Sequence, residues 1–300
     1  MRSGVCPTAV ASDDVAKVEA IFLQFVSGAS FAAMNCSIRM ASEELHPLQI
    51  IALRNVLVVC FLLVVLDAST IAQAWRALIG PSKWRFIANG FVNLGTMIAW
   101  FWSVTLLPLA AATSLFFSKV VFATCFAAIL LKESILPWPL IGAIVTVAGV
   151  AIAVGSDLPG STAGIALALI SGLTGGLAVV LGKALYRLAN PSATLLTFLA
   201  VASLPCLVVS MPFWKWSSDD KALWIIGTAI FSLISQVSFT RAYAIADVSL
   251  LSPLEATRIV FGALLGYWAF SELPARTLPF GTAIIVAGAV MASRRSSLKG

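Results

Sequence analysis

Four ionisable residues stand within long apolar stretches of the sequence: Arg54, Lys119, Glu255 and Arg258. A charged side chain near the centre of a bilayer costs about 2.5–3.5 kcal/mol on insertion scales, so each is expected to have a function. Lys119, Arg258 and Glu255 together carry a charge of +1, and Arg54 raises it to +2. Because a positive site attracts a carboxylate, phosphate or sulfonate, we predict that Lys119 and Arg258 bind the anionic part of a small metabolite.

Glu255 lies three residues before Arg258, which puts both side chains on one face of a helix. Two interpretations follow from this spacing. Glu255 is a proton-coupling group, protonated on one side of the membrane and paired on the other, or it only neutralises Arg258 in a structural pair. The sequence leaves both interpretations open.

Three apolar stretches carry polar or aromatic residues at helical spacing, which places each set on one helical face. Within a membrane, such a face looks onto a water-filled cavity or onto another helix, where it serves only as interhelical hydrogen bonding. Together with the cations, the three faces favour a cavity. The sets are Gln24, Ser27, Phe31 and Asn35; Asn89, Asn93, Thr96 and Trp100; and Ser232, Ser235, Gln236 and Phe239. The predicted substrate-binding residues are Lys119, Arg258, Glu255, Asn93, Trp100, Gln236 and Asn35.

A GxxxG pattern at Gly262 and Gly266 predicts a packing role, because small residues at this spacing let helix backbones approach closely. Pro253 has no amide hydrogen for the preceding turn and predicts a local break beside Glu255. Broken helices near the midplane are a feature of transporter sites, so we expect Pro253 to shape the site through packing.

The helices that must position these residues follow from composition. Of the 300 residues, 60% are hydrophobic and 11% are charged, which is too little charge to cover the surface of a soluble enzyme. A membrane-spanning helix needs about 20 mostly apolar residues. Ten candidate spans meet this requirement: 20–38, 47–66, 86–107, 109–131, 138–156, 161–182, 192–213, 222–240, 248–270 and 277–293.

Ten spans put both ends of the chain on one side of the membrane. A cytoplasmic N-terminus places twelve Lys and Arg residues inside and four outside, in agreement with the positive-inside rule. We therefore expect both termini in the cytoplasm, with a disordered tail at residues 1–16 and a basic tail at residues 294–300. The net charge of +6 is thus a topology signal, and no nucleic-acid binding is expected.

The two halves of the chain resemble each other. Residues 101–153 align with residues 240–292 without a gap, which pairs Lys119 with Arg258. The same alignment pairs Glu133 with Glu272, and both glutamates are expected to hold the turn to the following helix through its first amides. Earlier in each half, at a different offset, Ser27-Gly28 meets Ser171-Gly172, and His46-Pro47 meets Asn190-Pro191.

Each half contains five spans, an odd number, so the second copy must enter the membrane in the opposite orientation. The predicted repeats are residues 17–156 and 157–293. Inverted repeats are typical of secondary transporters, whose substrate site lies near the midplane between the two copies. One sequence in two orientations gives two nearly equivalent packings, one open to each side.

The two halves end in similar motifs. Leu130-Leu131-Lys132-Glu133 precedes Gly142-Ala143 and Ala148-Gly149, and Phe270-Ser271-Glu272 precedes Gly281 and Ala287-Gly288. With five spans repeated twice, this pattern resembles the drug/metabolite transporter superfamily, specifically the EamA-type ten-helix transporters. The resemblance implies an all-α integral membrane protein with ten transmembrane helices in two inverted five-helix repeats. It also implies transport of amino acids, other metabolites or drugs, in a bacterial-type plasma (inner) membrane.

Other classes of function have little support. Five scattered cysteines and the single histidine, His46, predict no metal site, disulfide framework or cofactor. No P-loop is present, and no catalytic residues are predicted because intramembrane Ser–His or paired Asp groups are missing. The expected partners are a small-molecule substrate, the lipid bilayer and protons as a candidate coupling ion. The expected oligomeric state is a monomer or a weak dimer.

The sequence therefore predicts a secondary active transporter of a small anionic or zwitterionic organic metabolite, such as an amino acid or organic acid. It works by alternating access, with export favoured. A polyspecific exporter of drugs or other cationic or apolar compounds remains an alternative, as does a passive channel or facilitator.

Overall fold

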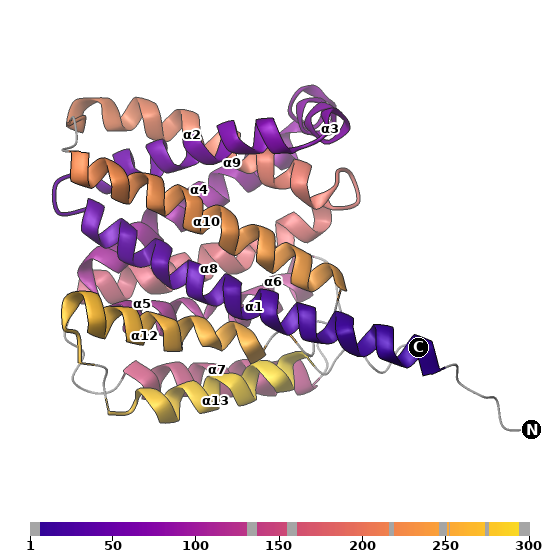
Figure 1. Cartoon of the computed structure of the whole chain (residues 1–300), viewed down its shortest axis with the longest axis vertical. Helices are drawn as coiled ribbons and strands as arrows, with labels where there is room; N and C mark the ends of the chain where they lie inside the picture. Colours follow the sequence, from indigo (N-terminus) through magenta and orange to yellow (C-terminus); the bar gives the residue numbers. More distant parts are fainter. Residues whose placement is uncertain are drawn as a thin grey trace, which may run out of the picture.

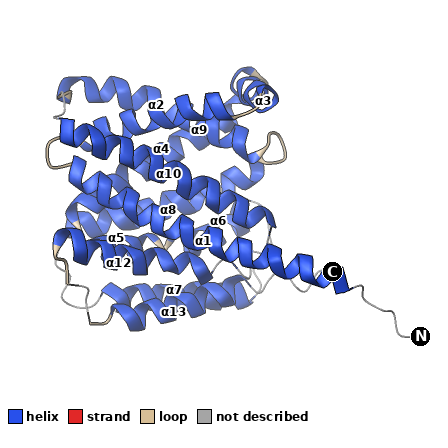
Figure 2. Ribbon diagram, in the orientation of Figure 1, coloured by secondary structure: helices blue, strands red, loops and turns tan. Residues whose placement is uncertain are grey.

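A computed structural model describes residues 7–130, 137–154, 161–215, 219–245, 251, 253–273 and 276–293. Within these ranges the regular structure is helical and contains no strand (Figure 2). Six of the described helices are long and apolar enough to cross a membrane. Large apolar side chains such as Val64, Trp84 and Trp268 are exposed on the outside of the bundle. An exposed apolar surface of this kind is expected where helices face lipid.

Two pairs of helices in the middle of the bundle join the two halves of the chain. Helix α1 (Pro7–Ala41) packs along α10 (Asp219–Ile245), and α4 (Lys83–Leu106) packs along α8 (Thr162–Leu185). These helices form the middle layers of the bundle (Figure 1). The polar faces predicted on α1, α4 and α10 therefore meet inside the molecule.

The remaining pairs form the two outer layers. Helix α2 (Pro47–Val65) packs against α9 (Pro191–Ser210) at the top of Figure 1. Helix α7 (Pro137–Val154) packs against α13 (Leu278–Ser293) at the bottom. Each of these pairs again joins one helix from each half. The first residues of α1 and the last of α13 lie at the same end of the bundle, on the right of Figure 1.

Two of the predicted spans are interrupted. The span expected at 109–131 consists of α5 (Leu109–Phe116) and α6 (Lys119–Leu130), joined by a turn with i→i+3 bonds. One of these runs from the Ser118 amide to the Leu115 carbonyl at 3.1 Å. The expectation of ten continuous helices is therefore not confirmed. In the middle of this span the backbone forms a tighter turn with the hydrogen bonds of a 3₁₀ helix.

The predicted ninth span, 248–270, is also interrupted. Its described part contains a short 3₁₀ helix, η2 (Pro253–Ala256), followed by α12 (Thr257–Phe270), which packs against α1 and α5. Pro253 is the first residue of η2, in agreement with the predicted break. Residues 246–250 and 252 lie outside the described part of the chain.

One helix was not expected at all. Helix α3 (Ala68–Ile79) lies between α2 and α4 and packs against α9. Asp67 caps its first turn by accepting from the Thr70 amide at 3.0 Å. Thr70 also accepts from Asn190 Nδ2 at 3.1 Å, which ties α3 to the start of α9. At 12 residues the helix is too short for the span rule that found the other helices.

The predicted joints between spans are confirmed where they carry a capping residue. His46 Nδ1 accepts from the Leu48 amide at 3.4 Å, and Pro47 occupies the first position of α2. Asn190 Oδ1 accepts from the Ala193 amide at 2.6 Å, and Pro191 begins α9. Both are preferred arrangements at a helix N-terminus.

The tails differ from expectation in one respect. Residues 7–16, predicted as part of a disordered tail, are the start of α1. The basic tail at 294–300 and Glu133 lie outside the described residues.

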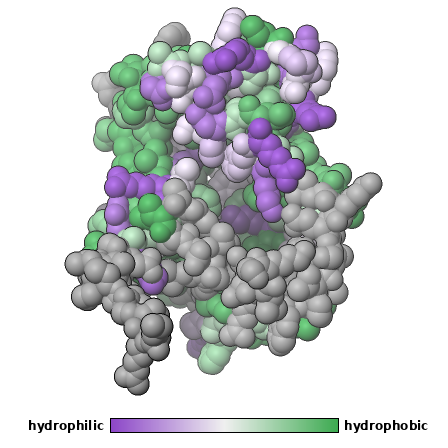
Figure 3. All heavy atoms as spheres, turned by 90° about the vertical axis from the view of Figure 1, so that its right-hand side faces the viewer, coloured by the Kyte–Doolittle hydropathy of each residue, from purple (hydrophilic) through white to green (hydrophobic). Residues whose placement is uncertain are grey.

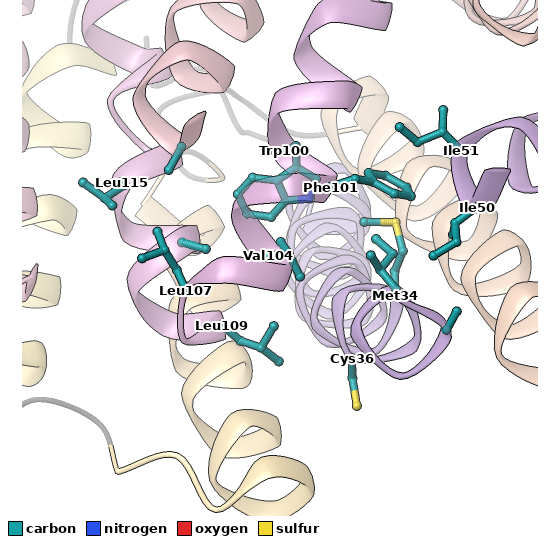
Figure 4. Packing of buried hydrophobic residues seen from close by; sticks show 14 of the residues in the cluster. Met34, Cys36, Ile50, Ile51, Trp100, Phe101, Val104, Leu107, Leu109 and Leu115 are labelled. Carbon is teal, nitrogen blue, oxygen red and sulfur yellow. The ribbon is translucent and has the colours of Figure 1, made fainter. Parts of the chain in front are cut away.

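The largest buried apolar cluster fills the space among α1, α2, α4 and α5. Figure 4 shows Met34, Ile50, Ile51 and Phe101 converging where α1, α2 and α4 meet. Leu107, Leu109 and Leu115 lie on the other side of Trp100 in the same view. Trp100 itself is 5% exposed, so it is part of the packed interior and not a lipid-facing residue.

Candidate substrate site

The predicted cations stand at the starts of the two helices that follow the interruptions. Lys119 is the first residue of α6, and Arg258 is the second residue of α12. Glu255 belongs to η2, and its Oε2 atom lies 3.3 Å from Lys119 Nζ. The side chains of this pair are 17% and 14% exposed. The first-half cation is therefore neutralised by an acid from the second half, a contact that sequence spacing alone did not predict.

A glycine lies against each cation-bearing turn. A Cβ atom on Gly172 of α8 would lie 2.3 Å from Ser118 Oγ and 3.3 Å from the Lys119 amide nitrogen. A Cβ atom on Gly28 of α1 would lie 2.7 Å from Thr257 Oγ1. Gly28 and Gly172 are equivalent in the sequence repeat. Each half thus uses a small residue to let a long helix approach the start of the broken one.

Aromatic rings connect the two cations. The Arg258 guanidinium lies 4.8 Å from the centre of the Phe31 ring, and Lys119 Nζ lies 5.0 Å from that of Phe116. Trp100 stacks on Phe31 at 5.6 Å and packs on Phe116 at 4.7 Å. Cation–π contacts of this type stabilise a desolvated charge. Trp100 and Lys119 were both predicted as site residues, and Phe116 brings them into one cluster.

The predicted residue Asn35 also reaches this cluster. Its Oδ1 atom accepts from Trp100 Nε1 at 3.2 Å, which fixes the orientation of the indole ring. Deeper along α1, Ser27 and Ser235 of α10 exchange hydrogen bonds with each other's backbone carbonyl, both at 3.0 Å. Arg258 Nη2 donates to Ser27 Oγ at 3.1 Å. The polar faces of α1 and α10 therefore support Arg258.

The hydrogen bonds of the other two predicted residues run to neighbours in their own helices. Asn93 Nδ2 donates to the Asn89 carbonyl of its own helix at 2.8 Å. Gln236 Nε2 approaches Ser232 Oγ at 3.5 Å, and Ser232 accepts from Arg54. Gln236 thus joins a second polar cluster, around Arg54. Arg54 was not among the substrate-binding residues predicted from the sequence.

Several of the inward-facing polar residues are only partly buried. Asn93, Thr96, Lys119, Gln236 and Glu255 have intermediate exposure. Figure 3 views the end of the bundle where α1 begins, and this end is hollowed near its centre. The partial exposure indicates that solvent reaches the polar faces.

The predicted packing glycines lie against other elements. A Cβ atom on Gly262 would lie 3.5 Å from Thr113 Oγ1, in ordinary contact with α5. One on Gly266 would lie 2.6 Å from Glu272 Oε2. Glu272 also accepts from the Leu109 amide at the start of α5, at 3.0 Å, and residues 274–275 of the turn to its own next helix lie outside the described part of the chain. The contact with α5 is not local in sequence, so the spacing of Glu272 did not predict it.

Among the described residues, no group of three or more His, Cys, Asp or Glu side chains gathers as metal ligands.

Comparison with known proteins places this arrangement in a family. The model of the EamA-like transporter family matches residues 18–155 and again residues 162–294. An uncharacterized transporter of Helicobacter pylori is 24% identical over 281 residues, covering 90% of this chain and 92% of that protein. A pseudopaline exporter of Pseudomonas aeruginosa is 23% identical over 278 residues, covering 89% and 93%.

The same fold occurs among solved structures. One crystal structure of a protein aligns with a TM-score of 0.63 over 94% of this chain and 96% of its own length, at 19% identity. The family and the named relatives are transporters, not enzymes, and are integral membrane proteins. Since the family model covers nearly the whole chain in two copies, this protein belongs to the EamA-like transporter family of the drug/metabolite transporter superfamily.

Proposed function

We propose that this protein is a secondary active transporter of a small anionic or zwitterionic organic metabolite, such as an amino acid or organic acid. The observation that carries the proposal is the placement of Lys119 and Arg258 at the starts of α6 and α12, with Glu255 beside Lys119. It acts in a bacterial-type plasma membrane with both termini in the cytoplasm.

The helix starts themselves favour an anion. The first amides of a helix carry a partial positive charge, which adds to that of a cation placed there. Broken helices whose N-termini point at the anionic group of a substrate are a known feature of transporter sites. A carboxylate of the substrate would contact Lys119 and Arg258, and Trp100 and Phe31 would pack on its apolar part.

Glu255 gives the site a candidate coupling device. Because Glu255 pairs with Lys119, an incoming carboxylate competes with it for the same ammonium group. Protonation of Glu255 removes its charge and releases Lys119 for the substrate. Proton binding and substrate binding are then linked through one salt bridge.

The proposed architecture is ten spans in two inverted repeats, over residues 17–156 and 157–293. The interhelical contacts support it, because exchanging the two halves maps the α1–α10 pair onto the α8–α4 pair. The exchange also maps the α2–α9 and α7–α13 pairs each onto itself. A fold with this symmetry has two equivalent packings, which alternating access requires.

Two differences support alternating access, one between the two ends of the bundle and one between the two halves of the chain. The end of the bundle where α1 finishes is joined by the Arg39–Glu272 salt bridge and by Gln49, which donates to the Lys215 carbonyl at 2.7 Å. The opposite end is hollowed (Figure 3). With cytoplasmic termini, this state is open to the cytoplasm and closed to the outside.

The second difference concerns equivalent residues in the middle layers. Ser27 and Ser235 join α1 to α10. Ser171, the repeat equivalent of Ser27, and Thr96, which lies 139 positions before Ser235 as Lys119 lies before Arg258, bond within their own helices, at 2.7 and 3.0 Å. In the other packing we expect the roles to exchange. Export is the favoured direction, in line with the related pseudopaline exporter.

A ligand screen tests the proposal. Purified protein is heated with anionic, zwitterionic, cationic and apolar metabolites, using wild type, Lys119→Ala and Arg258→Ala. A ligand at 100 times its Kd stabilises the folded state by about 2.7 kcal/mol, a visible shift in Tm. We expect anions or zwitterions to stabilise the wild type but neither variant. Arg76→Ala is the control, because Arg76 is exposed and bonds within its own helix.

The competing functions predict other results. Stabilisation by cationic or apolar compounds, equal in all variants, would favour the polyspecific exporter. Flux of the ligand into liposomes that does not saturate would favour a channel. For the coupling role, transport by Glu255→Gln should no longer depend on pH, and persistence of the wild-type pH dependence would contradict it.

A further inference from the structure

A second basic side chain is buried outside the cluster of Lys119 and Arg258. Arg54 of α2 is 3% exposed. Its Nη1 atom donates to Asn55 Oδ1 at 2.8 Å and approaches Met97 Sδ at 3.8 Å, and its Nη2 atom donates to Ser232 Oγ. All three partners are neutral, and no carboxylate in the described part of the chain pairs with Arg54. A buried guanidinium surrounded only by neutral groups has no counter-charge.

Hydrogen-bond donors exceed acceptors around this guanidinium. The Nε atom of Arg54 is buried and has no acceptor among the described residues. Asn55 Nδ2 donates only to the sulfur of Met97, at 3.7 Å, which is a weak acceptor. Ser232 Oγ takes hydrogen bonds from both Arg54 and Gln236, so its own hydrogen must point to a third group.

The surplus of hydrogen-bond donors around Arg54 indicates what kind of ligand this cluster suits. Arg54, Asn55, Ser232 and Gln236 come from two helices, α2 and α10, and Arg54 Nε and Asn55 Nδ2 have no strong acceptor among the described residues, as they would in a self-contained polar network. Groups with more donors than acceptors and a net positive charge are suited to a negative ion. Gln236 is partly exposed, and it connects the cluster to the inward-facing polar surface.

We propose that Arg54, Asn55, Ser232 and Gln236 form a second anion site, for a single compact negative charge. The chemistry fits a halide ion or the carboxylate end of a transported molecule. The site neighbours the proposed substrate site on two helices: Met97 lies one turn before Trp100, and Ser232 lies one turn before Ser235. It does not depend on binding at Lys119 and Arg258.

The test measures stabilisation by simple anions. Purified protein in a low-salt buffer is titrated with sodium chloride or sodium acetate, the Arg54 variants are titrated in parallel as the control for ionic strength, and Tm is followed by tryptophan fluorescence. We expect a saturable rise in Tm for wild type, at least a tenfold higher apparent Kd for Arg54→Lys, and no saturable rise for Arg54→Gln. Arg54→Lys keeps the charge but offers fewer donors.

Matched variants separate the two sites. Lys119→Ala should keep the wild-type chloride response, because the ammonium group of Lys119 is not part of the Arg54 cluster. Ser232→Ala removes one contact of Arg54 without changing charge, and it should weaken the chloride response. This variant replaces Arg54→Gln in the test if Arg54→Gln does not fold. Equal responses to chloride and acetate assign the site to small anions generally, and a response to acetate alone that Lys119→Ala retains assigns it to the substrate's carboxylate.

An unchanged Tm of the wild type with both anions, or equal responses in wild type and Arg54→Lys, would overturn the proposal. Loss of the chloride response in Lys119→Ala would also overturn it, because the anion would then bind at the substrate site. The metabolite screen with Lys119→Ala is read separately, so a failure here leaves the proposed transport function untouched.

Discussion

Arg39 of α1 and Glu272, which follows α12, form a salt bridge between residues 233 positions apart in the sequence. Glu272 also accepts from the Leu109 amide at 3.0 Å, and Arg39 lies 4.5 Å from the centre of the Phe270 ring. The bridge therefore connects α1, α5 and the end of α12. In the proposed cycle these elements must separate when the site opens on this side.

Replacing Glu272 by Gln should loosen this end of the bundle. The change removes the charge that holds Arg39, at a cost of about 1–3 kcal/mol in the free energy of unfolding. Cys36 lies one turn before Arg39 and is 8% exposed, so it reports the opening directly. With the other cysteines replaced by serine, we expect Cys36 to react several-fold faster with a maleimide in Glu272→Gln than in its parent.

A control for this experiment is available at the same end. Glu43 pairs with Lys221, but its side chain is 59% exposed, and exposed pairs contribute little. Glu43→Gln should leave the reactivity of Cys36 unchanged. Equal rates in Glu272→Gln and Glu43→Gln would show that the Arg39–Glu272 bridge does not close the bundle.

Helices α7 and α13 meet through equivalent glycines, and substitution there should be costly. A Cβ atom on Gly149 would lie 2.6 Å from the Ile285 amide nitrogen, and one on Gly288 would lie 2.6 Å from that of Thr146. Backbone cannot yield as a flexible side chain does, so the helices must move apart. We expect Gly149→Ala and Gly288→Ala each to lower stability by about 1–3 kcal/mol, measured by thermal unfolding in detergent.

Gly95 provides the comparison for these two variants. A Cβ atom there would have no neighbour within 4 Å, and alanine is a better helix former than glycine. Gly95→Ala should therefore be neutral or stabilising by about 0.5–1 kcal/mol. If all three variants unfold at the same temperature as wild type, the close approach of α7 and α13 is wrong.

Much of this fold could be predicted because apolar spans and capping residues are local signals. The joints at His46 and Asn190 were marked by a polar residue before a proline, and in the structure both residues cap the helix that follows. The turn between α5 and α6 could not be predicted in this way, since its sequence contains no proline or glycine. Helix α3 was missed because it is shorter than a span.

For the candidate site, residue type was informative and partners were not. Charges within apolar stretches identified Lys119, Glu255 and Arg258, which do cluster. The spacing placed Glu255 on one helical face with Arg258 but did not predict that Lys119, 136 residues away, lies 3.3 Å from it. Such contacts depend on how helices pack, and a helical face in the sequence does not say which helix it meets.

Asp67 gives the structure a pH-dependent cap at the start of α3. Hydrogen bonds from Ser69 and from the side chain and amide of Thr70 lower the pKa of its carboxyl group to about 2. The pKa in an unfolded chain is about 3.9, so the cap stabilises fully above that value and is lost as pH falls towards 2. We expect the Tm difference between wild type and Asp67→Ala to be constant near neutral pH and to shrink in this acidic window.

Asparagine at position 67 separates titration from loss of the acceptor. Its side-chain oxygen also caps a helix, but it does not titrate. The Tm difference between wild type and Asp67→Asn should change with pH only through the loss of the wild-type charge. A difference between wild type and Asp67→Ala that persists unchanged below the folded pKa would show that the carboxylate form of Asp67 is not what stabilises α3.

Cross-links between equivalent serine and threonine positions test the proposed exchange of packings. Ser27 Oγ and Ser235 Oγ lie 3.4 Å apart, so cysteines at both positions should form a disulfide in the present packing. The equivalent pair, Thr96 and Ser171, should come together in the opposite packing. In a background without native cysteines, each double variant should lose transport on oxidation and regain it on reduction, because a bridge holds one of the two states. Single-cysteine variants should keep transport under oxidation.

If the Ser27→Cys/Ser235→Cys protein still transports when fully cross-linked, α1 and α10 do not separate during the cycle. If Thr96→Cys/Ser171→Cys never cross-links, the second packing does not mirror the first, and the inverted repeat alone does not generate alternating access.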